Sequence, residues 1–270
     1  MAGSDTLLEA ANISIRPRQR VSDRWLVDSV GFELNRGEVL GLVGESGSGK
    51  TLSTLALLGL AGARLDVTGA LRFDGECFDL SAPDRLRPLR GARIGMIFQD
   101  PRLSLNPVRT IAGHFRELWP GRHGSGPSVR QRSADLLHSV GISDPDRRLR
   151  QYPHELSGGM CQRVMIALAL ATEPTLLIAD EPTTALDTTV QAQILDLIDT
   201  LRRERGLSVI MISHDLAVIS EIADRVAVMR HGRMVETGSQ TAIFNNAQSA
   251  YTRSLVGFAS KSSLGLEGAL

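Results

Sequence analysis

The sequence predicts an α/β fold in which a small helical subdomain is inserted into a core with a largely parallel sheet. Three observations predict this class. Strand-like and helix-like segments alternate between residues 175 and 229, which is typical of parallel sheets. A glycine-rich loop at residues 44–51 joins a short apolar strand to a helix. From residue 100 to about 153, proline, glycine and arginine become more frequent and helical patterns appear.

Short apolar segments with strand character dominate the first hundred residues. A basic, turn-prone segment at residues 16–24 separates the first two predicted strands, and further turns are expected at Gly69 and Asp74-Gly75. Residues 51–60 are expected to form the helix that follows the glycine-rich loop. The predicted strands are, in order, residues 7–15, 27–34, 38–43, 67–78 and 94–98.

The rest of the chain is predicted to be helical first and then alternating. Helical patterns cover residues 111–118 and 129–140, with a loop at residues 119–127 between them. An apolar run at residues 164–172 predicts a further helix, and residues 259–270 are expected to form a flexible tail. The remaining predicted elements are strand 175–179, helix 190–204, strand 208–212, helix 216–223 and strand 226–229, followed by a hairpin turn at residues 230–233.

The composition is that of an ordinary globular protein, with 270 residues of which 42% are hydrophobic and 22% charged. The formal net charge is zero, which gives no indication of bulk nucleic-acid binding. No apolar run approaches the roughly 18 residues of a membrane span, and we expect no secretory signal. Cys77 and Cys161 lie far apart in the sequence, so neither a disulfide framework nor an iron–sulfur site is predicted. These features favour a cytosolic protein.

The glycine-rich loop matches the phosphate-binding pattern G-x-x-x-x-G-K-[ST] in full. Its lysine stands out because Lys50 and Lys261 are the only lysines among 30 basic residues, which leaves 30 − 2 = 28 arginines. An ammonium on a flexible stem can act as a point charge between phosphate oxygens, whereas a planar guanidinium would not fit the same pocket.

The rest of the loop suits the same chemistry. Successive backbone N–H groups and the positive end of the following helix would hold the phosphates, and the Thr51 hydroxyl would bind Mg²⁺. The alternative is a glycine- and serine-rich turn that binds nothing. The residues expected to bind phosphate are Gly44, Glu45, Ser46, Gly47, Ser48, Gly49, Lys50 and Thr51.

A second signal is the apolar strand that ends in Asp180 and Glu181. At the carboxyl end of a sheet strand, both carboxylates would face the ligand crevice. Asp180 would hold Mg²⁺ through water, and Glu181 would orient or deprotonate a water that attacks the γ-phosphate. The alternative is that the two carboxylates cap a helix.

A third signal is Ser157-Gly158-Gly159, which opens the predicted helix within residues 156–172. A serine hydroxyl, glycine amides and a helix dipole could together form a second anion site. The alternative, an N-cap serine with a flexible turn, does not explain why this segment lies between the phosphate loop and the strand that ends in Asp180.

With these motifs, the chain resembles the ATP-binding subunits of ATP-binding-cassette (ABC) transporters. The resemblance extends over residues 7–256. The family motifs occur in order: the phosphate loop, Gln99, the LSGGM segment at 156–160, the strand that ends in Asp180-Glu181, residues 185–187, and His214. The resemblance implies a P-loop NTPase core of the ABC-ATPase type, with an antiparallel β subdomain and a helical subdomain inserted at about residues 100–160. A single domain would then cover residues 1–258.

The subgroup resembled is that of the peptide and nickel importers. It rests on FQDP and SLNP at residues 98–101 and 104–107, on ADEPTTALD at residues 179–187, and on YTRSL at residues 251–255. The resemblance implies an ATPase that powers dipeptide or oligopeptide import. An importer of nickel or another metal chelate is the alternative, because substrate is selected by other subunits.

The resemblance also implies a role for each site residue. Glu181, His214 and Gln99 would be catalytic, with Glu181 acting on water and His214 contacting the γ-phosphate. Thr51, Gln99 and Asp180 would hold Mg²⁺. Two ATPase subunits would pack head to tail with ATP between them, so that the phosphate loop of one faces the other's signature segment. The residues expected on the signature side of this interface are Ser157, Gly158, Gly159 and Asp187.

The implied partners are a second ATPase subunit (a paralogue or a second copy), two membrane permeases and an extracytoplasmic solute-binding protein, with no nucleic acid. The chain would lie peripherally on the cytoplasmic side of the cell membrane. A soluble ABC ATPase of DNA repair or translation is less favoured, because the chain has one phosphate loop and no heptad run. Residues 15–17 offer no aromatic residue to stack on adenine, and Trp25 lies close to the next strand.

Overall fold

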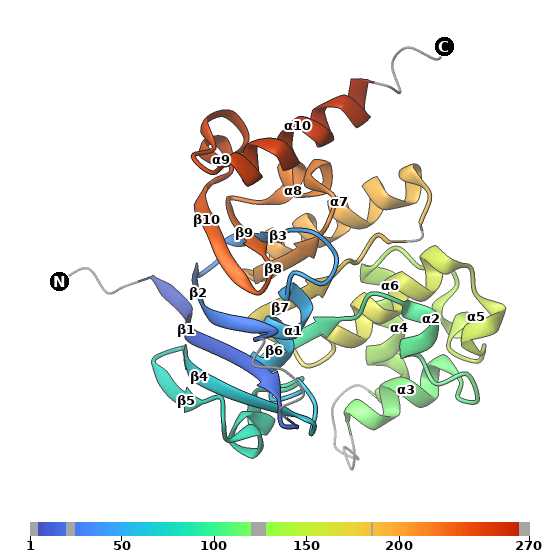
Figure 1. Ribbon diagram of the computed structural model, residues 1–270. Coiled ribbons are helices and arrows are strands. Elements are labelled where there is room, and N and C mark those ends of the chain that lie inside the picture. The colour runs from blue at the N-terminus through green and yellow to red at the C-terminus, as the bar shows by residue number, and fades with distance from the viewer. Residues whose placement is uncertain (1–4, 20–24, 120–127, 185, 265–270) are drawn as a thin grey trace. The chain divides into compact units, whose positions relative to one another are not determined.

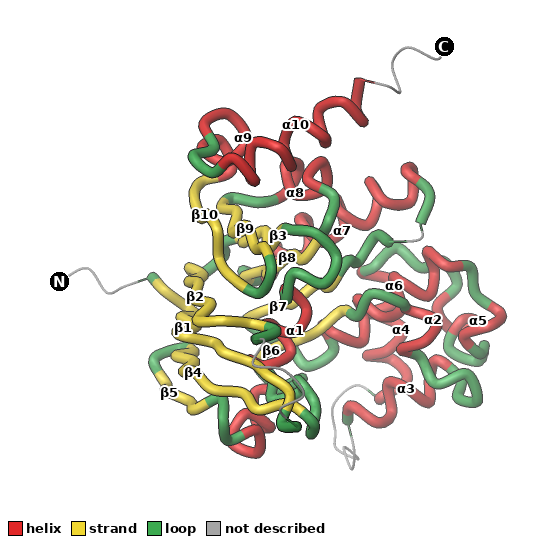
Figure 2. The backbone as a smooth tube through the Cα atoms, viewed as in Figure 1, coloured by secondary structure: helices red, strands yellow, loops and turns green. Residues whose placement is uncertain are grey.

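The structure is a computed structural model that describes residues 5–19, 25–119, 128–184 and 186–264 (Figures 1 and 2). The chain forms two compact units, which are described here one at a time. Unit 1 consists of residues 1–90 and 202–270, and unit 2 of residues 91–201.

Unit 1 contains two sheets and the helices that accompany them. Its first segment contains β1 (Thr6–Pro17), β2 (Val27–Asn35), β3 (Val39–Val43), α1 (Lys50–Leu57), β4 (Leu65–Phe73), β5 (Glu76–Asp79) and the 3₁₀ helix η1 (Pro83–Leu89). Its second segment contains β8 (Ser208–Ser213), α8 (Leu216–Ile222), β9 (Arg225–Arg230), β10 (Arg233–Ser239), α9 (Gln240–Asn246) and α10 (Ala250–Leu264).

The first sheet of unit 1 is antiparallel, with the strand order β2-β1-β4-β5. Side chains such as Leu8, Ile13 and Phe73 are fully buried, so the sheet has an apolar face of its own. This sheet confirms the predicted antiparallel β subdomain. The expected turn at Asp74-Gly75 joins β4 to β5, whereas the turn expected at Gly69 is wrong: Gly69 lies inside β4, opposite an irregularity in β1.

The second group of strands in unit 1 is largely parallel, as predicted. Strand β3 pairs in parallel with both β8 and β9, and β10 adds an antiparallel strand beside β9. Every residue of β3 and β8 is buried. Burial on both faces explains why these strands are continuous apolar runs instead of alternating ones.

Helix α1 begins at Lys50, directly after the phosphate loop, and ends at Leu57, three residues before the predicted end at residue 60. The backbone N–H of Leu60 donates to the Leu55 carbonyl at 2.8 Å, and the N–H of Gly59 donates to the Ala56 carbonyl at 2.9 Å. These bonds form a Schellman motif, which terminates the helix although the apolar pattern continues.

The C-terminal part of unit 1 has more regular structure than the sequence pattern predicts. Strand β10 and helices α9 and α10 follow the hairpin turn at residues 231–232, and α10 continues to Leu264, beyond the predicted start of a tail at residue 259. Figure 1 shows α9 and α10 in the red part of the chain, and α10 contacts α8. Residues 265–270 lie outside the described residues.

Unit 2 combines two strands with a set of helices. Its elements are β6 (Ile94–Ile97), α2 (Pro101–Ser104), α3 (Ile111–Leu118), α4 (Val129–Ser139), α5 (Pro145–Arg148), the 3₁₀ helix η2 (Pro153–Glu155), α6 (Gly158–Leu170), β7 (Leu176–Asp180) and α7 (Thr188–Arg205), whose last turn belongs to unit 1. The compact unit is therefore larger than the predicted helical subdomain, because it also includes β6, β7 and most of α7.

Hydroxyl side chains start three of these helices close to where they were expected. Thr110, Ser128 and Ser157 accept hydrogen bonds from N–H groups in the first turns of α3, α4 and α6. Of the predicted loop at residues 119–127, residues 120–127 lie outside the described residues. No helix within the described ranges is both long and apolar enough to cross a membrane. Both cysteines are free thiols, as predicted.

Candidate nucleotide-binding site

The phosphate loop of unit 1 follows a buried strand, and its lysine is buried at its centre. Lys50 is only 5% exposed, and its Nζ donates to the carbonyls of Gly44 at 2.6 Å and Glu45 at 3.0 Å. Gly49, the residue before α1, has φ +102°, and no side chain caps the start of the helix. An uncapped helix start beside a buried ammonium fits the phosphates of a nucleotide.

The turn between β9 and β10 is hydrogen-bonded to the phosphate loop. The backbone N–H of Gly232 donates to the Ser48 carbonyl at 3.0 Å. A Cβ on Gly44 would lie 2.1 Å from the Met229 carbonyl oxygen. Gly44 is therefore required by close backbone contact, which the sequence motif alone does not show.

His214 lies at the same edge of the unit 1 sheet as the phosphate loop. Strands β3 and β8 are parallel, and Val43 pairs with Ser213. His214 therefore follows β8 at the level where Gly44 follows β3, and it is exposed there. The next residue, Asp215, caps α8 through the N–H of Ala217 at 2.8 Å, which fixes the backbone after His214.

In unit 2, parallel pairing brings Gln99 and Glu181 together. Ile97 at the end of β6 pairs with Ala179 in β7, so the residues two positions further along lie level with each other. Gln99 Nε2 donates to Glu181 Oε2 at 2.8 Å, and the Thr184 hydroxyl donates to the same oxygen at 2.9 Å. The Glu181 carboxylate is thus held in one orientation at the carboxyl end of β7.

Asp180 and Glu181 differ in exposure and in backbone shape. Asp180 is 4% exposed as the last residue of β7. Glu181 has φ +46°, a left-handed conformation that is uncommon for a residue with a side chain. The helix that follows, α7, takes its cap from Asp187, whose Oδ1 accepts the N–H of Val190 at 2.9 Å. The two carboxylates are therefore not the caps of α7.

The signature segment and Asp187 line one groove of unit 2, of about 840 Å³, together with Gln99. Ser157 caps α6 by accepting the N–H of Met160 at 3.3 Å, and Gly159 approaches Val190 so closely that a Cβ would lie 2.9 Å from its Cγ1. The second predicted anion site therefore combines a capping serine with a wide, accessible groove.

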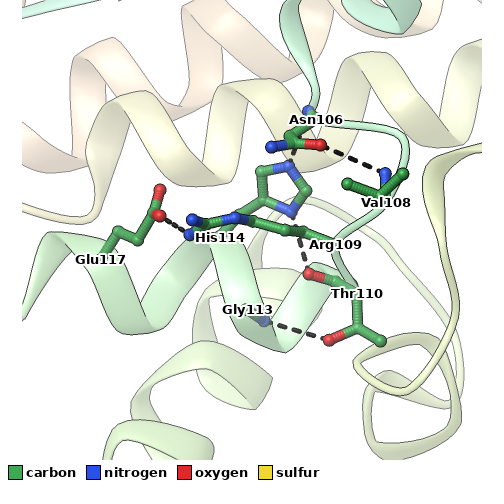
Figure 3. Close-up of polar contacts among 7 residues, drawn as sticks. All are labelled: Asn106, Val108, Arg109, Thr110, Gly113, His114 and Glu117. Atoms are coloured by element: carbon green, nitrogen blue, oxygen red, sulfur yellow. Dashed lines mark hydrogen bonds and ion pairs between the residues drawn. The ribbon is translucent and has the colours of Figure 1, made fainter.

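Two exposed apolar side chains follow Gln99 in unit 2. Leu103 is 86% exposed and Val108 is 79% exposed. Figure 3 shows how the segment with Val108 is held: the N–H of Asn106 donates to His114 Nε2 at 2.9 Å, and His114 Nδ1 lies 2.9 Å from the Thr110 carbonyl. Nε2 accepts in this arrangement, which leaves Nδ1 to face the Thr110 carbonyl.

Trp25, an aromatic residue upstream of the phosphate loop, packs against Arg16. The Arg16 guanidinium carbon lies 4.9 Å from the centroid of its ring, in a cation–π contact, and the ring is 37% exposed. One face of Trp25 is therefore already in contact with a cation.

The predicted site residues thus form two groups. Unit 1 brings together residues 44–51 and His214, and unit 2 brings together Gln99, Glu181 and the signature groove with Asp187. Within the described ranges, no group of three or more His, Cys, Asp or Glu could hold a metal by itself.

Sequence reasoning missed two contacts of the site. Thr184 was part of a recognised segment, but nothing local indicated that its hydroxyl holds Glu181. Tyr251 belonged to a segment matched only for its resemblance, yet its hydroxyl oxygen accepts the backbone N–H of Glu45 at 3.4 Å. For both Thr184 and Tyr251, the only signal in the sequence was that a polar residue of a matched motif had no assigned role.

Comparison with known proteins identifies the family. A family model described as ABC transporter matches residues 27–184. The dipeptide transport ATP-binding protein DppD of Escherichia coli is 47% identical over 256 residues, 93% of this chain and 77% of that protein. The oligopeptide transport ATP-binding protein OppD of Lactococcus lactis is 44% identical over 256 residues, 94% of this chain and 75% of that protein. The peptidoglycan transport ATP-binding protein YejF of Agrobacterium fabrum is 48% identical over 93% of this chain, which spans 46% of that protein.

Solved structures share the fold. CbiO1 from Clostridium perfringens, part of the ABC transporter complex cbiONQ, has a TM-score of 0.73 at 26% identity, over 90% of this chain and 92% of that one. The ATP-binding cassette MJ0796, in a dimeric post-hydrolysis state bound to ADP and Pi, has a TM-score of 0.72 at 27% identity, over 86% of this chain and 98% of that one.

A phosphate loop after one buried parallel strand and a carboxylate pair after another define a nucleotide-hydrolysing P-loop protein. The family match makes this class specific: the chain belongs to the ABC transporter family, as an ABC-type ATPase that binds ATP. The predicted fold class and the resemblance to the peptide importer group are confirmed.

Proposed function

We propose that this chain is the ATP-hydrolysing subunit of an importer for dipeptides or oligopeptides. DppD and OppD, of which this chain spans 77% and 75%, are named as dipeptide and oligopeptide transport proteins, which supports peptides over nickel. The main support for hydrolysis is the Glu181 carboxylate at the end of β7. Its Oε2 accepts hydrogen bonds from Gln99 Nε2 at 2.8 Å and from the Thr184 hydroxyl at 2.9 Å.

Each group of site residues has a separate task in this proposal. The backbone N–H groups of residues 44–51 and the Lys50 ammonium bind the β- and γ-phosphates, and His214 contacts the γ-phosphate. Thr51, Asp180 and Gln99 would hold Mg²⁺, which would offset phosphate charge. Glu181 accepts a proton from the attacking water, while Gln99 and Thr184 keep its carboxylate aimed.

The signature groove supports a head-to-tail dimer. Ser157, Gly158, Gly159 and Asp187 lie on an open groove of unit 2, whereas Lys50 of the phosphate loop belongs to unit 1. A second ATPase subunit, paralogue or copy, would place its ATP there. The solved structure of MJ0796 is dimeric and bound to ADP and Pi, which supports a dimer as the state that handles the nucleotide.

The exposed apolar side chains that follow Gln99 in the sequence support the proposal of permease partners. Leu103 and Val108 are exposed on a segment that begins at a residue tied to Glu181, so contact with a membrane subunit there could affect hydrolysis. We infer two permeases, a solute-binding protein and a peripheral position on the cytoplasmic side of the cell membrane.

One matched pair of variants tests the proposal in a strain that lacks this chain. Wild type is expected to restore uptake of a labelled dipeptide, and Glu181→Gln and Lys50→Ala are not. The purified Glu181→Gln protein should bind labelled ATP as wild type does, while the assembled transporter loses at least about 100-fold in turnover, since a general base is removed. Lys50→Ala should weaken ATP binding itself.

Several outcomes would contradict the proposal. Normal turnover by Glu181→Gln would remove the hydrolytic role of that carboxylate, and unaltered ATP affinity in Lys50→Ala would remove the phosphate role of the loop. Restored uptake of nickel without uptake of dipeptide would replace the peptide substrate with the metal alternative.

A further inference from the structure

The C-terminal helix of unit 1 contacts the phosphate loop directly. The Tyr251 hydroxyl oxygen accepts the backbone N–H of Glu45, the second residue of the loop, at 3.4 Å. The Arg230 guanidinium lies over the tyrosine ring, with its carbon 4.5 Å from the ring centroid. Three elements therefore meet at Glu45: the loop itself, the end of β9 and the first turn of α10.

Hydrogen bonds at the start of α10 fix the position of Tyr251. The Ser249 hydroxyl accepts the N–H of Tyr251 at 3.2 Å. The Glu236 carboxylate of β10 accepts the N–H groups of Gln248 at 2.7 Å and Ser249 at 3.0 Å, and Arg253 donates to the Gln248 carbonyl at 2.8 Å. The position of the phenol is thus set by the body of unit 1, so it can restrain the loop instead of moving with it.

The phenol is in the protonation state that this contact needs. Burial raises the pKa of Tyr251 above its usual value of 10.0, and the nearby Glu45 carboxylate raises it further, against the opposing effect of the Glu45 N–H. The hydroxyl therefore keeps its proton at neutral pH. It can accept from the Glu45 N–H and donate to the Glu45 carboxylate, which would restrain both parts of the residue.

Tyr251 and Lys50 hold the same peptide from opposite ends. The Lys50 ammonium donates to the carbonyls of Gly44 and Glu45. When Lys50 turns to nucleotide phosphates, its three N–H donors must be shared between the phosphate oxygens and these carbonyls, which weakens its hold on the Gly44 and Glu45 carbonyls. The Tyr251 contact does not involve Lys50, so it remains available to hold Glu45 in place.

We propose that Tyr251, held by Arg230, is a positioning residue that keeps the first residues of the phosphate loop in the conformation that binds ATP. This inference rests on the proposed role of the loop in holding the phosphates of ATP. It adds a contact 206 residues away in the sequence to the nucleotide site. Loss of the contact should weaken ATP binding without altering the residues that carry out hydrolysis.

The test uses the full chain with Tyr251→Phe, which keeps the ring and removes only the hydroxyl. The variant is expected to bind Mg·ATP about threefold to tenfold more weakly. In the assembled transporter, KM should rise by the same factor while kcat stays within about twofold. Amide hydrogen exchange should rise in a peptide that covers residues 43–51. Tyr152→Phe, a change at the other tyrosine of the chain, is the matched control and should leave affinity and exchange unchanged.

Variants of Arg230 separate positioning from a general loss of structure. Arg230→Lys keeps a cation over the ring and should bind ATP nearly as wild type does, whereas Arg230→Gln should resemble Tyr251→Phe. Added to Tyr251→Phe, Arg230→Gln should cost little more, since Arg230 acts on the loop only through the Tyr251 hydroxyl, which Tyr251→Phe has already removed.

The outcomes distinguish this inference from the proposed function. If wild type binds ATP and Tyr251→Phe binds it equally well, or if exchange in the loop is unchanged, only the role of Tyr251 is overturned. If Lys50→Ala also binds as wild type does, or wild type does not bind ATP, both are overturned.

Discussion

At the residue scale, Glu181 combines a demanding backbone conformation with a fixed side chain. Its φ of +46° belongs to a region that costs a side-chain-bearing residue about 1–3 kcal/mol. Its carboxylate accepts hydrogen bonds from Gln99 and Thr184. Strain that persists beside such bonds indicates that the surroundings hold the carboxylate in place, which is what a residue acting on water needs.

Two glycines of the phosphate loop differ in why a side chain is disfavoured: at Gly44 by close contact with backbone, and at Gly47 by backbone conformation alone. Gly44→Ala would place a Cβ 2.1 Å from the Met229 carbonyl oxygen at φ +150°, whereas Gly47 has φ +77° and nothing within 4 Å. Gly47→Ala should therefore cost about 1 kcal/mol of unfolding free energy from conformation alone. Gly44→Ala should cost more than about 2 kcal/mol, because the clash is with backbone. Equilibrium urea unfolding measures both, and equal costs would contradict the close contact at Gly44.

At the element scale, helix starts were predictable and several ends were not. Thr110, Ser128 and Ser157 mark the starts of α3, α4 and α6 because the capping hydroxyl lies within three residues of the N–H it accepts. The end of α1 at Leu57 was mispredicted, since its apolar pattern continues past the Schellman motif. Strand β10 escaped prediction because its residues alternate between exposed and half-buried, with a weak apolar signal.

The attachment of α10 to β10 should depend on pH through Glu236. Burial is the largest influence and acts to raise the pKa of Glu236, but the N–H groups of Gln248 and Ser249 and the charge of Arg253 help to hold the pKa below its usual value of 4.5. A carboxyl group with a lowered folded-state pKa stabilises the folded state above pH 4.5, and this stabilisation is lost as the pH falls through the folded-state pKa.

The corresponding measurement compares melting temperatures of wild type and Glu236→Gln from pH 7 to pH 3. Wild type should be the more stable above pH 4.5, and the difference should shrink below that value. A difference that does not change with pH would show that the ionised carboxylate is not what holds the start of α10.

At the scale of the whole molecule, the site residues are divided between two compact units. Unit 1 contains the phosphate loop and His214, and unit 2 contains Gln99, Glu181 and the signature groove. The lysine of the phosphate loop therefore belongs to one unit and the signature serine to the other. This division is the physical basis for proposing that a second subunit completes each ATP site.

The two cysteines differ in exposure, so thiol reactivity reports on the folding of unit 2, with Cys77 as an internal reference. Cys77 of unit 1 is exposed, whereas Cys161 in α6 of unit 2 is 0% exposed, and burial raises the pKa of its thiol above the usual 9.0. Native protein should therefore release one equivalent of product with a thiol reagent, and unfolded protein two. Cys77→Ser should reduce the native value to none, and fast reaction of that variant would contradict the burial of α6.

The sequence by itself determined the features that depend on neighbouring residues: the phosphate loop, the carboxylates that end an apolar strand, the capping hydroxyls and the class of fold. Only the tertiary structure decided which distant residues meet. Gln99 and Glu181, 82 positions apart, are joined by the register of β6 and β7. Tyr251 and Glu45 are joined by the docking of α10. Such contacts depend on the packing of many side chains at once, which no local pattern contains.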